Sequence, residues 1–275
     1  PGNSGDTPPR RVDKGLRYTV VGHATVLIQV DGVNILTDPI WSKRASMVSW
    51  AGPRRVAAPG ITFSQLPPID AVLISHNHYD HMDIPTLRRL ARRDNPIVIT
   101  GTGNGATLNR HGITNVRELE WWQETQVGGL TVLFTPARHF SRRGVNDYNR
   151  SLWGGFGVLA PSGNICFIGD SGYGDFFKQI GRRMGRVDLA FIPIGAYEPA
   201  WMMDTVHLTP EQAFQVHLDL GARRSVAIHF GTFQLTDEPM DEPAKRLARV
   251  LATGNPGSHD FAVPVFGKAA SLEVQ

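Results

Sequence analysis

A short segment, residues 75–81 (SHNHYDH), holds four side chains that can bind a divalent metal ion. It directly follows the apolar run AVLI, which has the composition of a strand. His76 and His78 are two residues apart, so in extended backbone their side chains project to the same side and can hold one metal ion. Asp80 and His81 come in the turn that follows and can serve a second metal ion nearby. This spacing predicts a cluster of metal ligands at the end of a strand.

Three other metal-binding side chains each lie at the end of an apolar run of strand length. His139 ends LTVLFTPARH, Asp170 ends NICFIGD, and His229 lies one residue before the end of RRSVAIHF. Each of them alone would more often be a packed residue or the cap of a strand end. If the strands share one edge of two packed sheets, however, the seven side chains supply five imidazoles and two carboxylates. That donor set suffices for two metal ions that keep open positions for water and substrate, as catalytic sites require.

These residues and the segments around them resemble the metallo-β-lactamase superfamily, and within it the N-acylphosphatidylethanolamine-hydrolysing phospholipase D branch with its bacterial relatives. The resemblance extends from about residue 17 to about residue 240 and is carried by GHATVLIQVDGVNILTDPIW, ISHNHYDHMD, SLWGGF, IGDSGYG, FIPIGAYEP, HLTPEQA and AIHFGTF. It implies an α/β fold of the αββα sandwich type, in which helices cover the outer faces of two mixed β-sheets.

The resemblance also implies how the seven candidate ligands are divided between two metal ions. One ion is held by His76, His78 and His139, the other by Asp80, His81 and His229, and Asp170 bridges both. We expect two divalent ions, and zinc first, because a mixed imidazole and carboxylate site suits it; iron or manganese also fits these donors. True β-lactamases commonly have a cysteine ligand at the second site, so the aspartate here argues against that activity.

The activity that the resemblance implies is hydrolysis of a phosphodiester, of phospholipase D type, in lipids similar to N-acylphosphatidylethanolamine. We expect a hydroxide that bridges the two metal ions to attack phosphorus, because two dications lower the pKa of bound water towards neutrality. Three alternatives stay open: a metal-dependent lactonase or other small-ester hydrolase, a nuclease of the same superfamily, and a non-catalytic metal-binding protein. The net charge of only +3 argues against the nuclease, and the complete ligand set argues against the non-catalytic protein.

Several residues outside the ligand set are candidates for supporting roles. Asp38, in the turn LTDP, could orient a metal-bound imidazole through its other ring nitrogen, and His23 is a candidate for the same outer layer. His207 could contact the substrate phosphate or protonate the leaving group, so it joins Asp80 and Asp170 as a candidate catalytic residue. The candidate substrate contacts, in part an apolar wall for acyl chains, are Tyr197, Trp201 and Met202.

To meet at one site, these residues require several short strands with helices between them. Runs of β-branched residues bounded by Gly, Pro, Asp or Asn recur from residue 17 to residue 230 and predict the strands. Helices are expected in IPTLRRLARR, in DEPAKRLARVLATG, which closes with Gly254, and in HLTPEQAFQVHLDLG. In the last of these, Thr209 is the expected N-cap, Pro210 the first helical residue and Gly221 the residue past the end. We expect a flexible lead-in over residues 1–16 and a single hydrolase domain over residues 17–275.

The composition of the 275 residues limits the class of protein. With 41% hydrophobic residues the chain can bury a large core. Its single cysteine, Cys166, excludes an intrachain disulfide and is expected in the core. No apolar segment reaches the ~18–20 residues of a bilayer span. We therefore expect a protein that is soluble, cytoplasmic or peripheral to a membrane, with a lipid or small-molecule phosphodiester as its partner and no nucleic acid; the first residue, Pro1, is compatible with a processed N-terminus.

Overall fold

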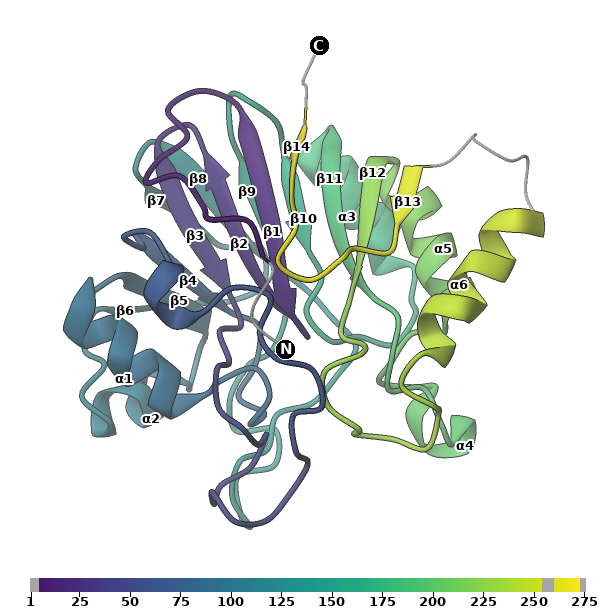
Figure 1. Cartoon of the computed structure of the whole chain (residues 1–275), viewed down its shortest axis with the longest axis horizontal. Helices are drawn as coiled ribbons and strands as arrows, with labels where there is room; N and C mark the ends of the chain where they lie inside the picture. The colour runs from purple at the N-terminus through teal and green to yellow at the C-terminus, as the bar shows by residue number, and fades with distance from the viewer. Residues whose placement is uncertain (1–4, 254–259, 273–275) are drawn as a thin grey trace.

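Two seven-stranded β-sheets pack face to face in the computed structural model, which describes residues 5–253 and 260–272 (Figure 1). The first sheet has the order β14-β1-β2-β3-β4-β5-β6, with β1 (Leu16–Gly22), β2 (Thr25–Val30), β3 (Val33–Thr37), β4 (Ala71–Ile74), β5 (Ile97–Gly101), β6 (Val116–Leu119) and β14 (Ala269–Leu272). The second has the order β13-β12-β11-β10-β9-β8-β7, with β7 (Glu124–Val127), β8 (Leu130–Thr135), β9 (Gly155–Leu159), β10 (Ile165–Phe167), β11 (Val187–Pro193), β12 (Ala222–Ile228) and β13 (Asp260–Ala262).

Helices cover the outer face of each sheet (Figure 1). The first sheet carries α1 (Ile84–Arg93) and α2 (Gly105–Arg110), and the second carries α3 (Phe176–Met184), α5 (Pro210–Leu220) and α6 (Glu242–Thr253). The short 3-10 turn η1 (Phe63–Gln65) and the one-turn helix α4 (Ala200–Met203) lie in connecting segments. This is the αββα sandwich that the resemblance implied, so the predicted fold class is confirmed.

Burial on both faces explains why the strands appear in the sequence as continuous apolar runs. In β2, Val26, Ile28 and Val30 point into the core between the two sheets, whereas Leu27 lies in the outer cluster beneath α1. Successive side chains of a strand point to opposite faces, so a strand that is apolar at every position needs cover on both sides. The helices provide that cover on the outside.

The predicted helix ends agree with the structure. Thr209 caps α5: its Oγ1 accepts a hydrogen bond from Gln212 N (3.3 Å), and Gln212 Oε1 accepts one from Thr209 N (3.0 Å). Pro210 is the first residue of α5, and Gly221 follows its end with a left-handed φ of 61°. The other two predicted helices are α1 and α6, and Gly254 lies outside the described residues. Helices α2 and α3 were not predicted, and the one-turn helix α4 replaces an expected loop.

The described part of the N-terminal lead-in lies against the body of the protein. Asp6 N donates to Gly267 O (2.9 Å), Gln29 Nε2 donates to Pro9 O (2.9 Å), and Arg11 forms an ion pair with Asp70. β1 begins at Leu16, close to the predicted domain start. Residues 1–4 lie outside the described residues, and the division into a flexible lead-in and one domain stays a prediction.

Cys166 lies in β10 and is fully buried beneath α3 and α5. Burial raises the pKa of its thiol to about 12, which disfavours the reactive thiolate. The expectation of a core cysteine is therefore confirmed.

The carboxyl ends of the strands that precede the candidate ligands meet at one edge of the sandwich. β3, β4 and β5 run parallel in the first sheet, as do β10, β11 and β12 in the second. β8 and β10 are both antiparallel to β9, so these two strands share a direction. The loops after β4, β8, β10 and β12 all emerge at the lower edge in Figure 1.

Candidate metal centre

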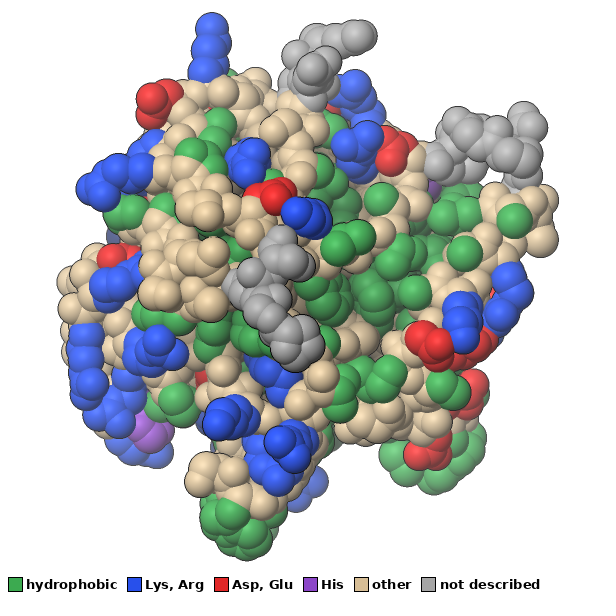
Figure 2. All heavy atoms as spheres, viewed as in Figure 1, with side chains coloured by type: hydrophobic (Ala, Val, Ile, Leu, Met, Phe, Trp, Pro, Cys, Tyr) green, Lys and Arg blue, Asp and Glu red, His purple; other side chains and the backbone are tan. Residues whose placement is uncertain are grey.

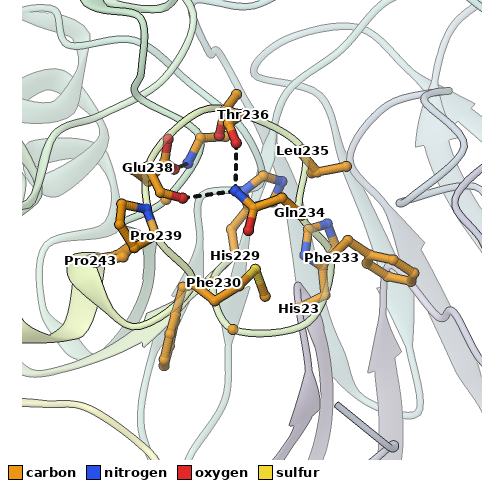
Figure 3. A pocket seen from close by; sticks show the side chains of 14 residues that line it. His23, His229, Phe230, Phe233, Gln234, Leu235, Thr236, Glu238, Pro239 and Pro243 are labelled. Carbon is orange, nitrogen blue, oxygen red and sulfur yellow. Dashed lines mark hydrogen bonds between the residues drawn. The ribbon is translucent and has the colours of Figure 1, made fainter. Parts of the chain in front are cut away.

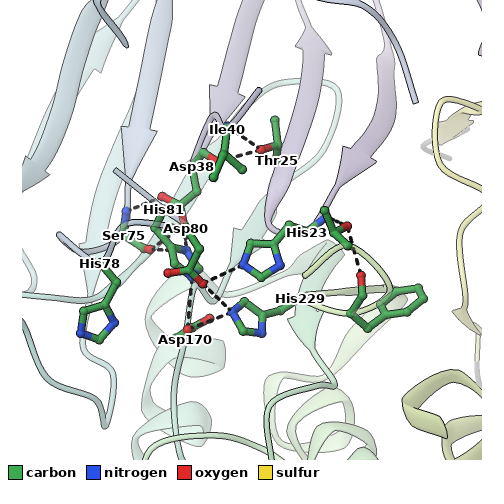
Figure 4. A network of polar contacts seen from close by, with 12 residues as sticks. His23, Thr25, Asp38, Ile40, Ser75, His78, Asp80, His81, Asp170 and His229 are labelled. Carbon is green, nitrogen blue, oxygen red and sulfur yellow. Dashed lines mark hydrogen bonds and ion pairs between the residues drawn. The ribbon is translucent and has the colours of Figure 1, made fainter. Parts of the chain in front are cut away.

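The loops after these four strands bring all seven candidate ligands together. Five of them are labelled in Figure 4: His78, Asp80, His81, Asp170 and His229. The side chains of His76, His81, His139, Asp170 and His229 are buried. His78 and Asp80 are half-buried, so the cluster opens to solvent on their side. Within each group described below, one donor atom from every residue lies within 4.8 Å of the others.

Three imidazoles form the first group of donors. His76 Nε2 lies 2.8 Å from His78 Nδ1, and His139 Nε2 lies 3.2 Å from the same nitrogen. Three ring nitrogens that converge on one point can share a single divalent cation, which each binds through a lone pair. This group contains the three residues that the resemblance assigned to one metal ion.

The second group surrounds the carboxylate of Asp80. Its Oδ2 lies 3.2 Å from His81 Nε2, 3.4 Å from His229 Nε2 and 2.8 Å from His23 Nε2. His81, His229 and Asp80 are the three residues that the resemblance assigned to the other ion. His23 adds a fourth imidazole, which contacts Asp80 from the turn between β1 and β2.

Asp170 lies between the two groups. Its Oδ2 is 3.1 Å from His229 Nε2 and 3.2 Å from His81 Nε2, and it is 3.9 Å from both His76 Nε2 and His139 Nε2. Among the described residues, His81 Nε2, His229 Nε2 and Asp170 Oδ1 are buried atoms with no hydrogen-bond partner. Buried polar atoms are rarely left without a partner, and a bound cation would accept the lone pairs of these nitrogen and oxygen atoms. The residues present therefore fit the metal ions that the sequence predicts.

The charges in the cluster also favour bound cations. Burial alone would raise the pKa of Asp170, but His229 and His81 outweigh it and hold that pKa well below its usual value. Burial alone would lower the pKa of His229, but Asp170 and Asp80 raise it to about 9. The negative charge of the ionised carboxylates thus favours protonation of the nearby imidazoles. Bound metal ions would supply the same positive charge in place of those protons.

The imidazoles of the first group differ from His229 in their charge. Burial lowers the pKa of His76 and His139 well below the usual value of an imidazole. Burial likewise lowers the pKa of His78. These rings are therefore neutral at pH 7, which is the form that binds a metal ion.

Outer hydrogen bonds fix the orientation of three ligand rings. His81 Nδ1 lies 2.6 Å from Asp38 Oδ2, His139 Nδ1 donates to Val206 O (2.9 Å), and His76 Nδ1 lies 2.9 Å from Ser75 Oγ. In each ring the other nitrogen, Nε2, is left free to face the cluster. Asp38 also accepts hydrogen bonds from Ser75 N (2.7 Å) and Ser75 Oγ (2.6 Å), so it joins the strand end to the ring of His81 (Figure 4).

Replacing Asp38 with asparagine is expected to weaken metal binding by about 10- to 100-fold, because the amide cannot reproduce the carboxylate that orients His81. A competition titration against a chelator would measure this affinity. Asp83→Asn is the matched control, since Asp83 is also buried but accepts hydrogen bonds from the hydroxyls of Ser42 (2.8 Å) and Thr86 (2.5 Å). Equal losses in both variants would contradict a specific role for Asp38.

Two histidines in the second group have unusual backbone conformations. His23 has a φ of 56° and His229 a φ of 58°, and His229 N donates to His23 O (2.9 Å). A left-handed conformation at a non-glycine residue costs about 1–3 kcal/mol. Gly195 approaches the same backbone closely, because a Cβ at that position would lie 2.3 Å from His229 O. The segment that follows β11 therefore requires glycine where it passes His229.

The segment 230–240 closes the cluster on the side of His23 and His229, where it lines a small pocket (Figure 3). Gln234 Nε2 donates to Thr236 O (2.6 Å) and to Glu238 O (2.8 Å), which holds the segment in a compact turn. Glu238 Oε1 accepts a hydrogen bond from Ala196 N (2.6 Å) and ties the turn to the end of β11.

The structure brings His207 to the cluster as well. Its Nδ1 lies 3.9 Å from Asp170 Oδ2, and its ring centroid lies 5.2 Å from that of His139 and 5.5 Å from that of His229. His207 Nδ1 is buried and has no hydrogen-bond partner among the described residues. Burial lowers its pKa to about 4, so the ring is neutral at pH 7.

The three predicted substrate contacts are placed differently. Trp201 and Met202 are exposed on α4, and the turn after α4 leads directly to His207, whose N donates to Met203 O (2.9 Å). Tyr197 is buried, and the guanidinium of Arg246 on α6 lies 4.9 Å from its ring centroid. The ring of Tyr197 thus packs against α6. The substrate roles of Tyr197, Trp201 and Met202 stay predictions.

Two supporting groups were not predicted. The carbonyl of Val206 has no sequence signal, because every residue carries one. Ser75 could have been found from its place directly before His76, where a hydroxyl can reach the adjacent ring. Among the described helices, none combines the length and the apolar character that a membrane span requires.

Comparison with known families gives one family match. The family described as Beta-lactamase superfamily domain matches residues 33–230, which is more than half of the chain. This range contains all seven candidate ligands and His207 but excludes His23.

Individual proteins are similar over most of the chain. An uncharacterized protein of Mycobacterium tuberculosis is 42% identical over 252 residues, which cover 90% of this chain and 66% of that protein. The protein of Caenorhabditis elegans named N-acyl-phosphatidylethanolamine-hydrolyzing phospholipase D 1 is 37% identical over 251 residues, which cover 87% of this chain and 70% of that protein. The chain thus spans about two thirds of the length of these two relatives.

The fold is also found in solved structures. Igni18, a novel metallo hydrolase from Ignicoccus hospitalis, has a TM-score of 0.72 at 21% identity, and the match covers 95% of this chain and 100% of that chain. At this identity the likeness concerns the fold alone.

Proposed function

We propose, from the premise that this chain belongs to the metallo-β-lactamase superfamily of metal-dependent hydrolases, that it cleaves a phosphodiester in the manner of a phospholipase D. The substrate class that we infer is a lipid similar to N-acylphosphatidylethanolamine. Hydrolysis of such a substrate gives a phosphomonoester and an alcohol, and needs no nucleophile from the protein.

The observation that carries this proposal is the position of Asp170 Oδ2 between two groups of donors. An oxygen ligand shared between two sites favours two similar metal ions close together, which is the arrangement suited to phosphoester hydrolysis. The similarity to the Caenorhabditis elegans protein, whose name states hydrolysis of N-acyl-phosphatidylethanolamine, supports a lipid substrate.

We propose two divalent metal ions, and zinc first, with iron or manganese as the alternatives that the donors also fit. His76, His78 and His139 would hold one ion, Asp80, His81 and His229 the other, and Asp170 would serve both. Bound there, the ions would supply an activated water near neutral pH and neutralise charge on the phosphate.

The chain's own residues would position that chemistry. Asp38 and the carbonyl of Val206 hold the rings of His81 and His139, so the donors are in place before substrate arrives. His207 is buried beside Asp170 with a free ring nitrogen, so we propose that it donates a hydrogen bond to a phosphate oxygen.

A substrate panel tests the proposal. The metal-loaded protein is expected to hydrolyse N-acylphosphatidylethanolamine and a chromogenic phosphodiester, with little turnover of a lactone or a β-lactam. Rates should be measured after chelation and again after reloading with zinc, iron or manganese, together with elemental analysis. Phosphodiester turnover should disappear with the metal and return with one of them.

Two other outcomes would contradict this proposal and favour a different function. Faster turnover of the lactone than of either phosphodiester would make the protein a lactonase. A metal-loaded protein without turnover of any ester would favour a non-catalytic metal-binding protein.

A further inference from the structure

A loop over residues 43–55 (the 43–55 loop) projects from the edge of the sandwich where the metal cluster lies. It is the long purple-blue loop at the bottom of Figure 1. Its two arms pair like a short hairpin, since Ala45 N donates to Pro53 O (3.0 Å) and Arg55 N donates to Lys43 O (2.8 Å). The loop therefore has a defined base rather than an irregular path.

Side chains of the body fix this base. Arg55 Nη2 donates to Ile40 O (2.7 Å), and its guanidinium lies 4.7 Å from the ring centroid of Phe233. Ala45 packs with Ile40 and Phe233 in a small buried cluster. Ser42 Oγ donates to Asp83 Oδ1 (2.8 Å), which links the loop to the start of α1 just after the ligand segment 75–81.

The tip of the loop exposes large apolar side chains. Met47 is 69% exposed and Trp50 is 78% exposed. Exposure of a tryptophan and a methionine on one tip gains nothing for the stability of the fold, because neither is removed from water. A partner that covers the tip would remove both side chains from water.

The charge of the segment identifies the kind of partner. Residues 39–69 contain no aspartate or glutamate, and the loop carries Lys43, Arg44, Arg54 and Arg55. Arg55 is turned inwards as described above, whereas Lys43 and Arg54 are exposed. Figure 2 shows hydrophobic side chains at the lowest point of the molecule with basic side chains directly above them, over the position of this loop. The partner therefore offers an apolar layer beneath negative charge.

A second apolar projection lies at the same end of the molecule. On α4, Trp201 is 78% exposed and Met202 is 50% exposed. α4 and the 43–55 loop both lie at the lower end of Figure 1, where Figure 2 shows two separate hydrophobic tips. Each tip consists of two exposed apolar side chains, whereas a stable protein interface takes roughly 20–30 residues from each partner. The basic groups belong to the 43–55 loop, whereas the exposed Asp204 directly follows α4. Two small apolar tips at one end of the molecule suit a surface that both can enter together, which is a lipid layer.

We propose that the 43–55 loop docks the protein on an anionic lipid surface. Met47 and Trp50 enter the interfacial layer, Lys43 and Arg54 lie against acidic headgroups, and Trp201 with Met202 provides a second apolar contact. Tryptophan at the interface with lysine or arginine beside it is the usual composition of such contacts. The inference rests on the proposed function only in that docking would place the metal cluster next to a lipid substrate.

Vesicle binding by the metal-loaded full chain tests the proposal. Binding should be measured by sedimentation with vesicles of phosphatidylcholine alone and with vesicles that also contain phosphatidylglycerol. The double variant M47S/W50S should bind both kinds about tenfold more weakly. The charge reversal K43E/R54E should weaken binding only to the anionic vesicles, by about fivefold or more per charge, and added salt should have the same effect.

Val265→Ser is the matched control, because Val265 is also 69% exposed but lies between β13 and β14. It should bind vesicles like the unchanged protein, and all variants should keep the thermal unfolding midpoint and the turnover of a soluble chromogenic phosphodiester. Failure of the unchanged protein to bind anionic vesicles would overturn the proposal, as would equal binding by M47S/W50S. A concentration-dependent dimer that these substitutions abolish, without vesicle binding, would assign the loop to a second copy instead.

Docking and catalysis fail in different ways. Vesicle binding that depends on the loop, without hydrolysis of any phosphodiester, would uphold docking and remove the proposed function. Hydrolysis of a lipid dispersed in detergent, without vesicle binding, would uphold the function and remove docking.

Discussion

Replacing Asp170 with asparagine is expected to remove bound metal and to lower phosphodiester turnover by more than about 100-fold, which exceeds the loss expected for an outer residue such as Asp38. Within the described part of the chain, Asp170 Oδ2 is the one carboxylate oxygen that faces His81 and His229 at 3.1–3.2 Å and His76 and His139 at 3.9 Å. An amide is neutral and has a single acceptor oxygen, so the variant loses both the charge and the geometry that two cations would share.

Elemental analysis and turnover, measured on the same preparation, check this expectation. Asp188→Asn is the matched control, because Asp188 is also a fully buried aspartate of the second sheet. It lies at the start of β11 and pairs with Arg186 (2.9 Å) and Arg223 (3.2 Å) instead of histidines. The control should lose stability but keep its metal. Full metal content and unchanged turnover in Asp170→Asn would rule out a shared metal ligand.

The part of the site that could be predicted is the part that local sequence encodes. His76, His78, Asp80 and His81 follow one another within a single loop, so their spacing alone brings them together. His139, Asp170 and His229 are distant in sequence. Their places at the ends of apolar runs joined them to the cluster on the condition that these strands share one edge, and the resemblance assigned all seven ligands. The fold class followed from the resemblance, and the apolar runs were consistent with it.

The rest depends on how the chain bends in space. His23 reaches Asp80 because a turn with φ 56° directs it there, and no residue type encodes that angle in a histidine. The carbonyl of Val206 reaches His139 only because α4 leads the chain back over the cluster. A residue that follows a strand does not always face the metal cluster. Tyr197 follows β11, but its ring lies beneath Arg246 of α6. Strands β6, β7, β13 and β14 were not predicted, because these short strands at or near the sheet edges carry little apolar pattern.

Replacing His207 with alanine is expected to lower turnover by about 10²- to 10³-fold, the range for loss of one hydrogen-bond donor to charge that develops in the transition state. The ring is buried within 3.9 Å of Asp170, and its Nδ1 has no partner among the described residues. Metal content should not change, because His207 is outside both proposed ligand groups. His217→Gln is the control, since His217 is a buried histidine in α5 whose Nδ1 lies 2.8 Å from Ser225 Oγ, away from the cluster.

Two roles for His207, a donor to phosphate and a proton donor to the leaving group, predict different results with a second variant. His207→Gln keeps an N–H donor but cannot transfer a proton at neutral pH. If His207 binds phosphate, the glutamine variant should recover part of the turnover, and the loss should be similar for alkyl and p-nitrophenyl leaving groups. If it protonates the leaving group, glutamine should not help, and only the substrate with the basic alkyl leaving group should suffer, since p-nitrophenolate departs without a proton. Burial favours the neutral ring, so we expect the first pattern. Unchanged turnover of both substrates in His207→Ala would show that this histidine does not act on the substrate at all.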